Sequence, residues 1–193
     1  MVEFDLLESV LGKTAGVIEG VTPEQRRLPT PCPDYDVAAL VDHLVGWIQV
    51  FDAGCHGRRY EGDANAYRSG PDPAGEFRAS AASLVAGWRE LGTDRQVTVT
   101  GGDGVPGAMV LNMTLMEYMT HGWDLAAATG QTVPYTEAEA AETLARAQAT
   151  LPPQYRGEGM PFAHEVPVDG DAAAVDRLIG FMGRDPSRPS PSR

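Results

Sequence analysis

Four long segments of the chain place their apolar residues three and four positions apart, which is the spacing of amphipathic α-helices. The four helices are expected over residues 3–20, from a cap at Asp34 or Asp36 to Ala53, over residues 74–91, and from Pro106 to Gly130. An amphipathic helix must bury its apolar face against another element. Four such helices therefore predict an all-α fold whose core is a four-helix bundle.

Smaller elements are expected on either side of the fourth helix. Residues 96–100 alternate with period two and run into a glycine-rich turn, so they predict a short strand or β-hairpin. After the fourth helix, Thr136 and Glu139 form a capping box for a fifth helix that ends near Thr150. Asp171 is expected to cap a last short helix. These elements are extra C-terminal helices beside the bundle.

Length and charge limit the organisation of the chain and its partners. The 193 residues show no internal repeat and predict one domain over residues 1–183, followed by a Pro- and Ser-rich disordered tail over residues 184–193. The 27 acidic residues outnumber the 15 basic ones and give a net charge of −12. Such a charge repels nucleic-acid phosphates and anionic lipid surfaces, so neither is expected as a partner.

The compartment is predicted from what the sequence lacks. No apolar run approaches the roughly 20 residues of a membrane helix, and the N-terminus is acidic where a signal peptide would be basic. We therefore expect a cytoplasmic protein; a homodimer remains an open possibility.

The two cysteines, Cys32 and Cys55, flank the second helix, whose ends lie about 28 Å apart at ~1.5 Å per residue. An intramolecular disulfide is not expected because it needs Cα atoms within roughly 7 Å.

A candidate metal site involves the second and fourth helices. Glu117 and His121 are four residues apart, so both side chains lie on one face of the fourth helix. His43 lies within the apolar stripe of the second helix. If the two helices are neighbours, these three residues form a set of two histidines and one carboxylate that leaves a coordination position open, as in catalytic zinc sites. Nickel, iron or manganese would accept the same ligands. Asp124 or Asp42 could accept a hydrogen bond from the outer nitrogen of a ligating histidine.

Each of these residues also has a purely structural interpretation. A Glu–His pair at this spacing is commonly a surface hydrogen bond or a weak ion pair. A single histidine on an apolar helix face, such as His43, is commonly a hydrogen-bonded core residue. The spacing alone leaves both interpretations open.

Several sequence segments together resemble a known family. They are residues 30–37 (TPCPDYDV), 42–46 (DHLVG), 105–107 (VPG), 117–126 (EYMTHGWDLA), 129–130 (TG) and 176–185 (DRLIGFMGRD). In this order they resemble the DinB-like superfamily, and within it the actinobacterial metal-binding family related to the N-terminal domain of mycothiol-dependent maleylpyruvate isomerase. Tyr35 stands where tryptophan is common in that family.

The resemblance implies a DinB-like four-helix bundle with His43, Glu117 and His121 as ligands of a divalent metal, zinc being the first candidate. It also implies that the metal activates a low-molecular-weight thiol, with mycothiol the candidate in actinomycetes. The isomerase has a further C-terminal domain that contributes to its active site, and this chain has no room for one. Maleylpyruvate isomerisation itself is therefore not expected.

The function that follows is a thiol-dependent transferase or isomerase acting on a small electrophilic substrate. Asp124 and His164 are the catalytic candidates, Asp124 as a carboxylate that orients a ligand and His164 as a proton shuttle from a loop. Two alternatives remain open. One is a metal-dependent hydrolase that activates water, and the other is a non-catalytic metal or small-molecule binding protein.

Overall fold

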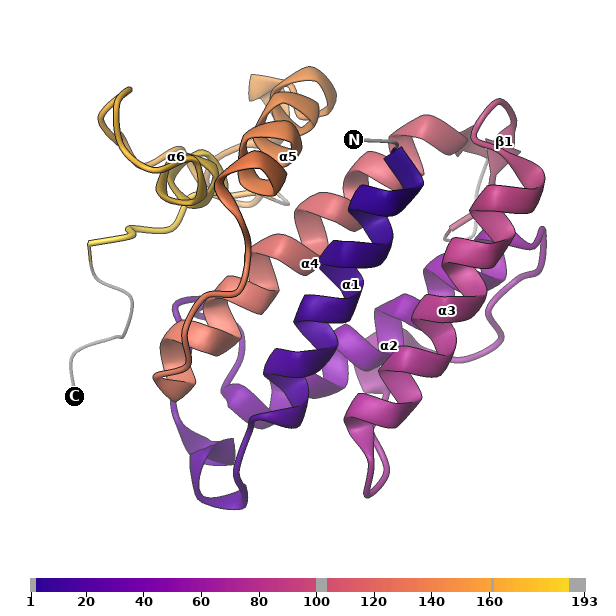
Figure 1. Ribbon diagram of the computed structural model, residues 1–193, viewed down its shortest axis with the longest axis horizontal. Helices are drawn as coiled ribbons and strands as arrows, with labels where there is room; N and C mark the ends of the chain where they lie inside the picture. The colour runs from indigo at the N-terminus through magenta and orange to yellow at the C-terminus, as the bar shows by residue number, and fades with distance from the viewer. Residues whose placement is uncertain (1–2, 100–103, 161, 188–193) are drawn as a thin grey trace.

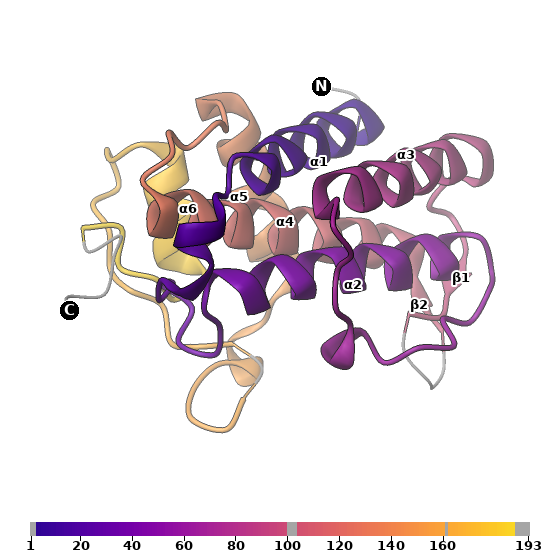
Figure 2. The same cartoon turned by 90° about the horizontal axis from the view of Figure 1, so that it is seen from below.

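The computed structural model describes residues 3–99, 104–160 and 162–187. Its four long helices lie side by side (Figures 1 and 2) and are α1 (Glu3–Glu19), α2 (Val37–Cys55), α3 (Pro73–Leu91) and α4 (Gly107–Thr129). α1 and α2 each pack against both α3 and α4, so the four helices enclose one common core. The prediction of an all-α fold built on a four-helix bundle is confirmed.

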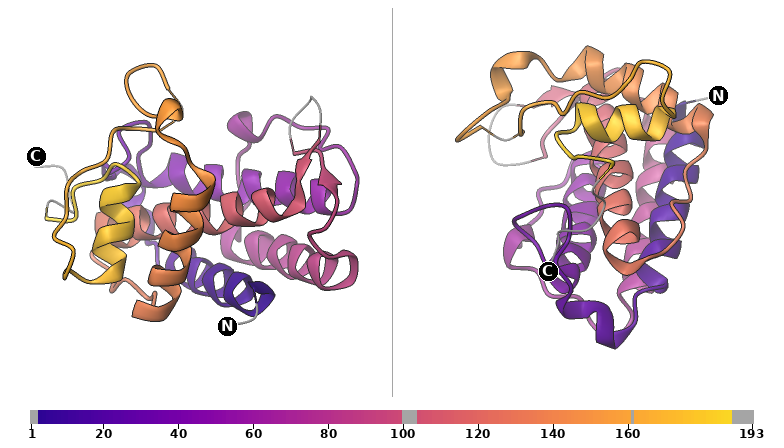
Figure 3. Two further views of the ribbon diagram at one scale, coloured as in Figure 1. Left: turned by 90° about the horizontal axis from the view of Figure 1, so that it is seen from above. Right: turned by 90° about the vertical axis from the view of Figure 1, so that its left-hand side faces the viewer.

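The remaining elements follow the prediction in outline. β1 (Gln96–Val97) pairs with β2 (Val105–Pro106) in an antiparallel two-stranded sheet. β1 is shorter than the predicted strand, and residues 100–103 lie outside the described residues. α5 (Glu137–Thr150) and α6 (Ala174–Phe181) pack together at one side of the bundle, where α5 contacts α4 (Figure 3).

Tyr118 at the centre of α4 fixes how the helices meet. Its ring is fully buried and contacts Phe77 of α3 and Phe51 of α2 edge-on, with ring centroids 5.3 Å and 6.1 Å apart. Its hydroxyl donates a hydrogen bond to the carbonyl of Leu44 on α2. The preceding residue, Glu117, contacts His43 of α2, so its side chain lies on the side of α4 that faces α2.

Local capping confirms some predictions and corrects one. Asp36 caps α2 by accepting a hydrogen bond from the backbone N–H of Ala39 at 2.8 Å. The predicted capping box at the start of α5 is present. The predicted cap of α6 by Asp171 is wrong, because α6 begins at Ala174, whose N–H donates to the carboxylate of Glu137 at 2.9 Å and 3.0 Å. The carboxylate comes from α5 and so lies outside any local sequence pattern.

The structure also places the cysteines and the C-terminal segment. Both cysteines are free and buried, as expected. Arg184, which the sequence analysis put at the start of the tail, lies against the bundle with a side chain 15% exposed. Residues 188–193 of that predicted tail are outside the described residues.

By length and composition α2 could cross a membrane. However, 67% of its most apolar 18-residue stretch is buried inside the bundle, as in the core helix of a bundle.

A buried carboxylate joins α5 to α1. Glu139 accepts hydrogen bonds from the Lys13 ammonium at 2.5 Å and the Ser9 hydroxyl at 2.6 Å, and also bonds Thr136. Burial by itself would raise the pKa of Glu139, but the hydrogen bonds from Lys13, Ser9 and Thr136 lower the pKa to about 2. The folded state therefore favours the ionised form more than the unfolded chain does.

We expect Glu139→Gln to lower the free energy of unfolding at pH 7 by about 2 kcal/mol. Since the folded pKa lies below the unfolded value, this contribution is complete above about pH 4.5 and is lost as the pH falls toward 2. Urea denaturation of both proteins across this range measures it. Glu142→Gln on the same helix, whose side chain is 45% exposed, is the control and should change stability by less than about 0.5 kcal/mol. Equal effects of the two substitutions would contradict the assignment.

Candidate metal centre

The three predicted ligands meet where α2 packs against α4. Nε2 of His43 lies 2.6 Å from Oε1 of Glu117, and Nε2 of His121 lies 3.7 Å from the same oxygen. The two imidazole rings are 5.2 Å apart between centroids and inclined by 72°. One donor atom from each of the three residues lies within 4.8 Å of the others. The structure therefore brings His43, Glu117 and His121 together as a compact group, called the triad below.

The outer nitrogen of each imidazole has its own partner. Nδ1 of His43 lies 3.0 Å from the Tyr35 hydroxyl, and Nδ1 of His121 lies 2.9 Å from Oδ2 of Asp124. These hydrogen bonds turn both Nε2 atoms toward Glu117. This is the arrangement of metal-ligating histidines, whose second nitrogen is held by a carboxylate, carbonyl or other polar group.

Asp124 is held in turn from the C-terminal segment. Its side chain is fully buried, and the Arg184 guanidinium lies 3.0 Å from Oδ2 and 3.4 Å from Oδ1. Arg184 also donates to the carbonyl of Met182 at 2.8 Å. A continuous series of polar contacts thus connects the segment after α6 to the His121 ring.

Two of the sequence candidates lie elsewhere. Asp42 accepts hydrogen bonds from the backbone N–H and hydroxyl of Ser69, so it holds the loop before α3, and Nδ1 of His43 bonds Tyr35 instead. His164 is exposed in a loop, with its ring near Gly157, and is not among the residues that line the cavity beside the triad. Tyr35, and not Asp42, is the hydrogen-bond partner of the outer nitrogen of His43. Its only sequence signal was its place in the segment that precedes α2.

Glu117 is ionised at neutral pH. Burial by itself would raise its pKa, but the charge of His121, the hydrogen bond from His43 and the charge of His43 lower the pKa to about 2. The triad therefore presents one carboxylate and two imidazoles, which are donors that zinc and neighbouring divalent metals accept.

A cavity of about 520 Å³ opens beside the triad. It lies between α2, α4, the segment before α2 and the C-terminal segment. The lining residues are Pro31, Cys32, Pro33, Asp34, Tyr35, His43, Trp47, Phe51, Met113, Met116, Glu117, Thr120, His121, Gly157, Met160, Phe162, Ala163, Met182, Gly183 and Arg184. A small molecule in this cavity would contact the triad directly.

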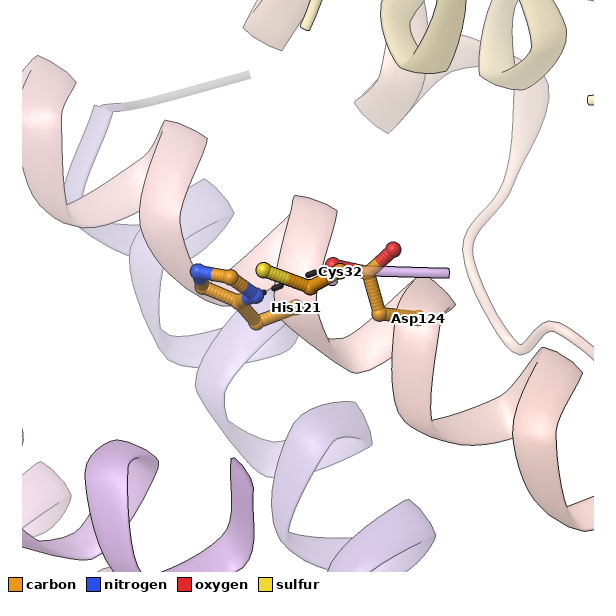
Figure 4. Close-up of side chains that lie close together, drawn as sticks. All are labelled: Cys32, His121 and Asp124. Atoms are coloured by element: carbon orange, nitrogen blue, oxygen red, sulfur yellow. Dashed lines mark hydrogen bonds and ion pairs between the residues drawn. The ribbon is translucent and has the colours of Figure 1, made fainter. Parts of the chain in front are cut away.

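A second group of possible ligands shares His121. Figure 4 shows the Cys32 sulfur beside the His121 ring, on the side where Nδ1 bonds Asp124, and donor atoms of the three residues lie within 4.8 Å of one another. Burial raises the pKa of the Cys32 thiol. Because the Arg184 guanidinium already contacts both oxygens of Asp124, a cation is disfavoured here and the triad is the better site.

Fold and site together define a helical bundle whose His–Glu–His group faces a small-molecule cavity. The sequence pattern of the mycothiol maleylpyruvate isomerase N-terminal domain matches residues 7–126, and the chain belongs to this family. The match includes all three triad residues and Asp124, and it ends before α5.

A relative is similar over most of this chain, and a solved structure shares its fold. An uncharacterized protein of Mycobacterium tuberculosis, Rv0738 in strain H37Rv and MT0763 in strain CDC 1551, is 31% identical over 176 residues, which cover 88% of this chain and 91% of that protein. The crystal structure of a mutant of the mycothiol-dependent maleylpyruvate isomerase is similar with a TM-score of 0.54 over 83% of this chain and 72% of that chain. At 18% identity, this similarity shows a shared fold.

Proposed function

We propose that the triad binds a divalent metal, zinc being the first candidate, and that the chain is a mycothiol-type thiol-dependent transferase or isomerase for a small electrophile. The observation that carries this proposal is the orientation of the two histidines. Both Nε2 atoms face Glu117 while both Nδ1 atoms are held by Tyr35 and Asp124.

The donor set fits such an ion. Two imidazoles and one carboxylate are three protein ligands, which leave a position for a further ligand. A divalent cation there would supply a Lewis acid that favours the thiolate form of a coordinating thiol at neutral pH. Nickel, iron and manganese fit the same donors. The family name supports mycothiol as the thiol.

Each residue of the site has a separate task in this proposal. Glu117 contributes the negative charge, and His43 and His121 contribute neutral nitrogen donors. Asp124 orients His121, and Tyr35 orients His43. The cavity gives a small molecule room to reach one side of the triad. His164 has no task here, because it does not line the cavity.

We also place the chain in the cytoplasm. The family name supports this placement, because the low-molecular-weight thiol that it names is kept reduced there. Direct localisation by fractionation of the producing cells tests this placement.

Purification without chelator, followed by metal analysis and a thiol-consumption assay, tests the proposed function. We expect about one divalent ion per chain and consumption of mycothiol only when an electrophile is present. A metal-dependent hydrolase would turn over its substrate without thiol. A binding protein would do neither, but its melting temperature would rise with ligand. Protein that holds no ion and is not stabilised by added metal would refute the proposal.

Tyr35→Phe is expected to lower zinc affinity about tenfold with little loss of stability. Phenylalanine keeps the ring that packs 4.7 Å from the His43 ring but removes the hydroxyl that fixes Nδ1. Competition with a chromogenic chelator measures the affinity. Tyr155→Phe, at a residue 49% exposed and outside the cavity lining, is the control and should leave affinity unchanged. Unaltered affinity in Tyr35→Phe would show that the hydroxyl does not position His43.

A further inference from the structure

Exposed methionines gather at the cavity beside the triad. Met113 is 36% and Met160 52% exposed, and both line the cavity. Met116 and Met182, each 3% exposed, lie deeper in the same lining. These thioethers come from α4, from the loop before residue 162 and from the residue that follows α6. A ligand that covers the two exposed side chains would remove apolar surface from water.

Aromatic rings extend this apolar lining. Trp47 and Phe51 of α2 and Phe162 of the C-terminal segment also border the cavity. Trp47 and Phe51 lie 6.1 Å apart between ring centroids, and the Trp47 ring is the same distance from the His43 ring. The apolar side of the cavity therefore begins directly beside the triad, where a reacting carbon would have to lie.

The charged groups of the lining do not favour an anionic substrate. Arg184 is the one Lys or Arg among the described lining residues, and its guanidinium is engaged by Asp124 and by the carbonyl of Met182. Asp34 and Glu117 are acidic. A bound thiolate and the Glu117 carboxylate would together carry two negative charges, which balance the two positive charges of a divalent ion. A carboxylate substrate would then find no unpaired cation.

We propose that the electrophile for this cavity is an uncharged, apolar molecule, such as a benzylic halide or an epoxide without a carboxylate. This inference rests on the proposed function, because it assumes that the cavity receives the second substrate. With a benzylic halide, the thiolate sulfur forms the new S–C bond and the carbon–halogen bond breaks. The halide leaves with the bonding electron pair, and the thiol proton passes to solvent. Flexible methionines allow such a cavity to accept apolar groups of several shapes.

Binding of an unreactive pair of probes separates this inference from the thiol chemistry. Benzyl alcohol and para-(hydroxymethyl)benzoate share one ring and differ by a single carboxylate. We expect the zinc-loaded protein, saturated with mycothiol so that no coordination position is open to the carboxylate, to bind benzyl alcohol at least about tenfold more tightly, as measured by calorimetry. Equal or tighter binding of the carboxylate would overturn the inference.

Substitutions at the exposed methionines test where the probe binds. The double variant Met113→Gln/Met160→Gln should weaken benzyl alcohol binding about fivefold without altering zinc affinity. Met109→Gln is a matched control, because Met109 is 38% exposed on the same helix but does not line the cavity. Equal binding by the double variant and Met109→Gln would also overturn the inference.

Thiol consumption is then assayed with benzyl chloride and para-(chloromethyl)benzoate. Selective consumption with benzyl chloride would support both proposals. If the binding preference holds but neither halide consumes mycothiol, the apolar preference of the cavity stands and the proposed thiol chemistry fails.

Discussion

Glu117→Gln is expected to lower zinc affinity by more than about 100-fold, beyond the 10- to 100-fold range of residues that only orient a ligand. The substitution keeps the shape of the side chain and can still accept the hydrogen bond from His43, but it removes the only carboxylate of the triad. Stability of the metal-free protein should fall by about 2 kcal/mol at pH 7, because the folded state lowers the pKa of Glu117 to about 2 and so favours its ionised form. Chelator competition and urea denaturation measure the two quantities.

A pair of histidine variants on α2 provides the control. His43→Ala should also abolish tight zinc binding. His56→Ala should not, since His56 caps the other end of α2 and contacts Asp52. Zinc affinity in Glu117→Gln or His43→Ala within a few-fold of the original protein would show that the triad is not the metal site.

The bundle could be predicted from the sequence because the buried positions of an amphipathic helix recur every three to four residues within that helix. Each long helix carries its apolar stripe within its own residues, so α1 to α4 could be predicted one at a time. The cap of α6 could not, because it comes from Glu137 on a different helix, 37 residues away. Contacts of this kind depend on tertiary packing, which periodicity does not encode.

The same distinction applies to the site. Glu117 and His121 share a face through helix geometry alone, and Asp124 follows one turn later on the same helix. The approach of His43 depends on how α2 packs against α4, which the rings around Tyr118 determine. The contact between Arg184 and Asp124 joins residues 60 positions apart, and no local sequence pattern predicts it.

Asp124→Ala is expected to cost about 3 to 5 kcal/mol of stability. Asp124 is fully buried and is the carboxylate on which His121 and Arg184 converge. Its removal leaves the Arg184 guanidinium, whose side chain is 15% exposed, without the carboxylate that it contacts. Zinc affinity should fall by about 10- to 100-fold as well, because Nδ1 of His121 loses its partner. Urea denaturation of metal-free protein and chelator competition separate these two effects.

The double variant Asp124→Leu/Arg184→Met distinguishes the structural role of Asp124 from its role in positioning His121. Removing both charges together avoids the uncompensated cation, so most of the lost stability should return. Zinc affinity should stay low, because leucine cannot accept a hydrogen bond from the His121 ring. If zinc affinity recovered together with stability, Asp124 would act only by neutralising Arg184. Recovery of stability alone would assign Asp124 the orientation of His121 and would make Arg184 the residue that holds Asp124 in place.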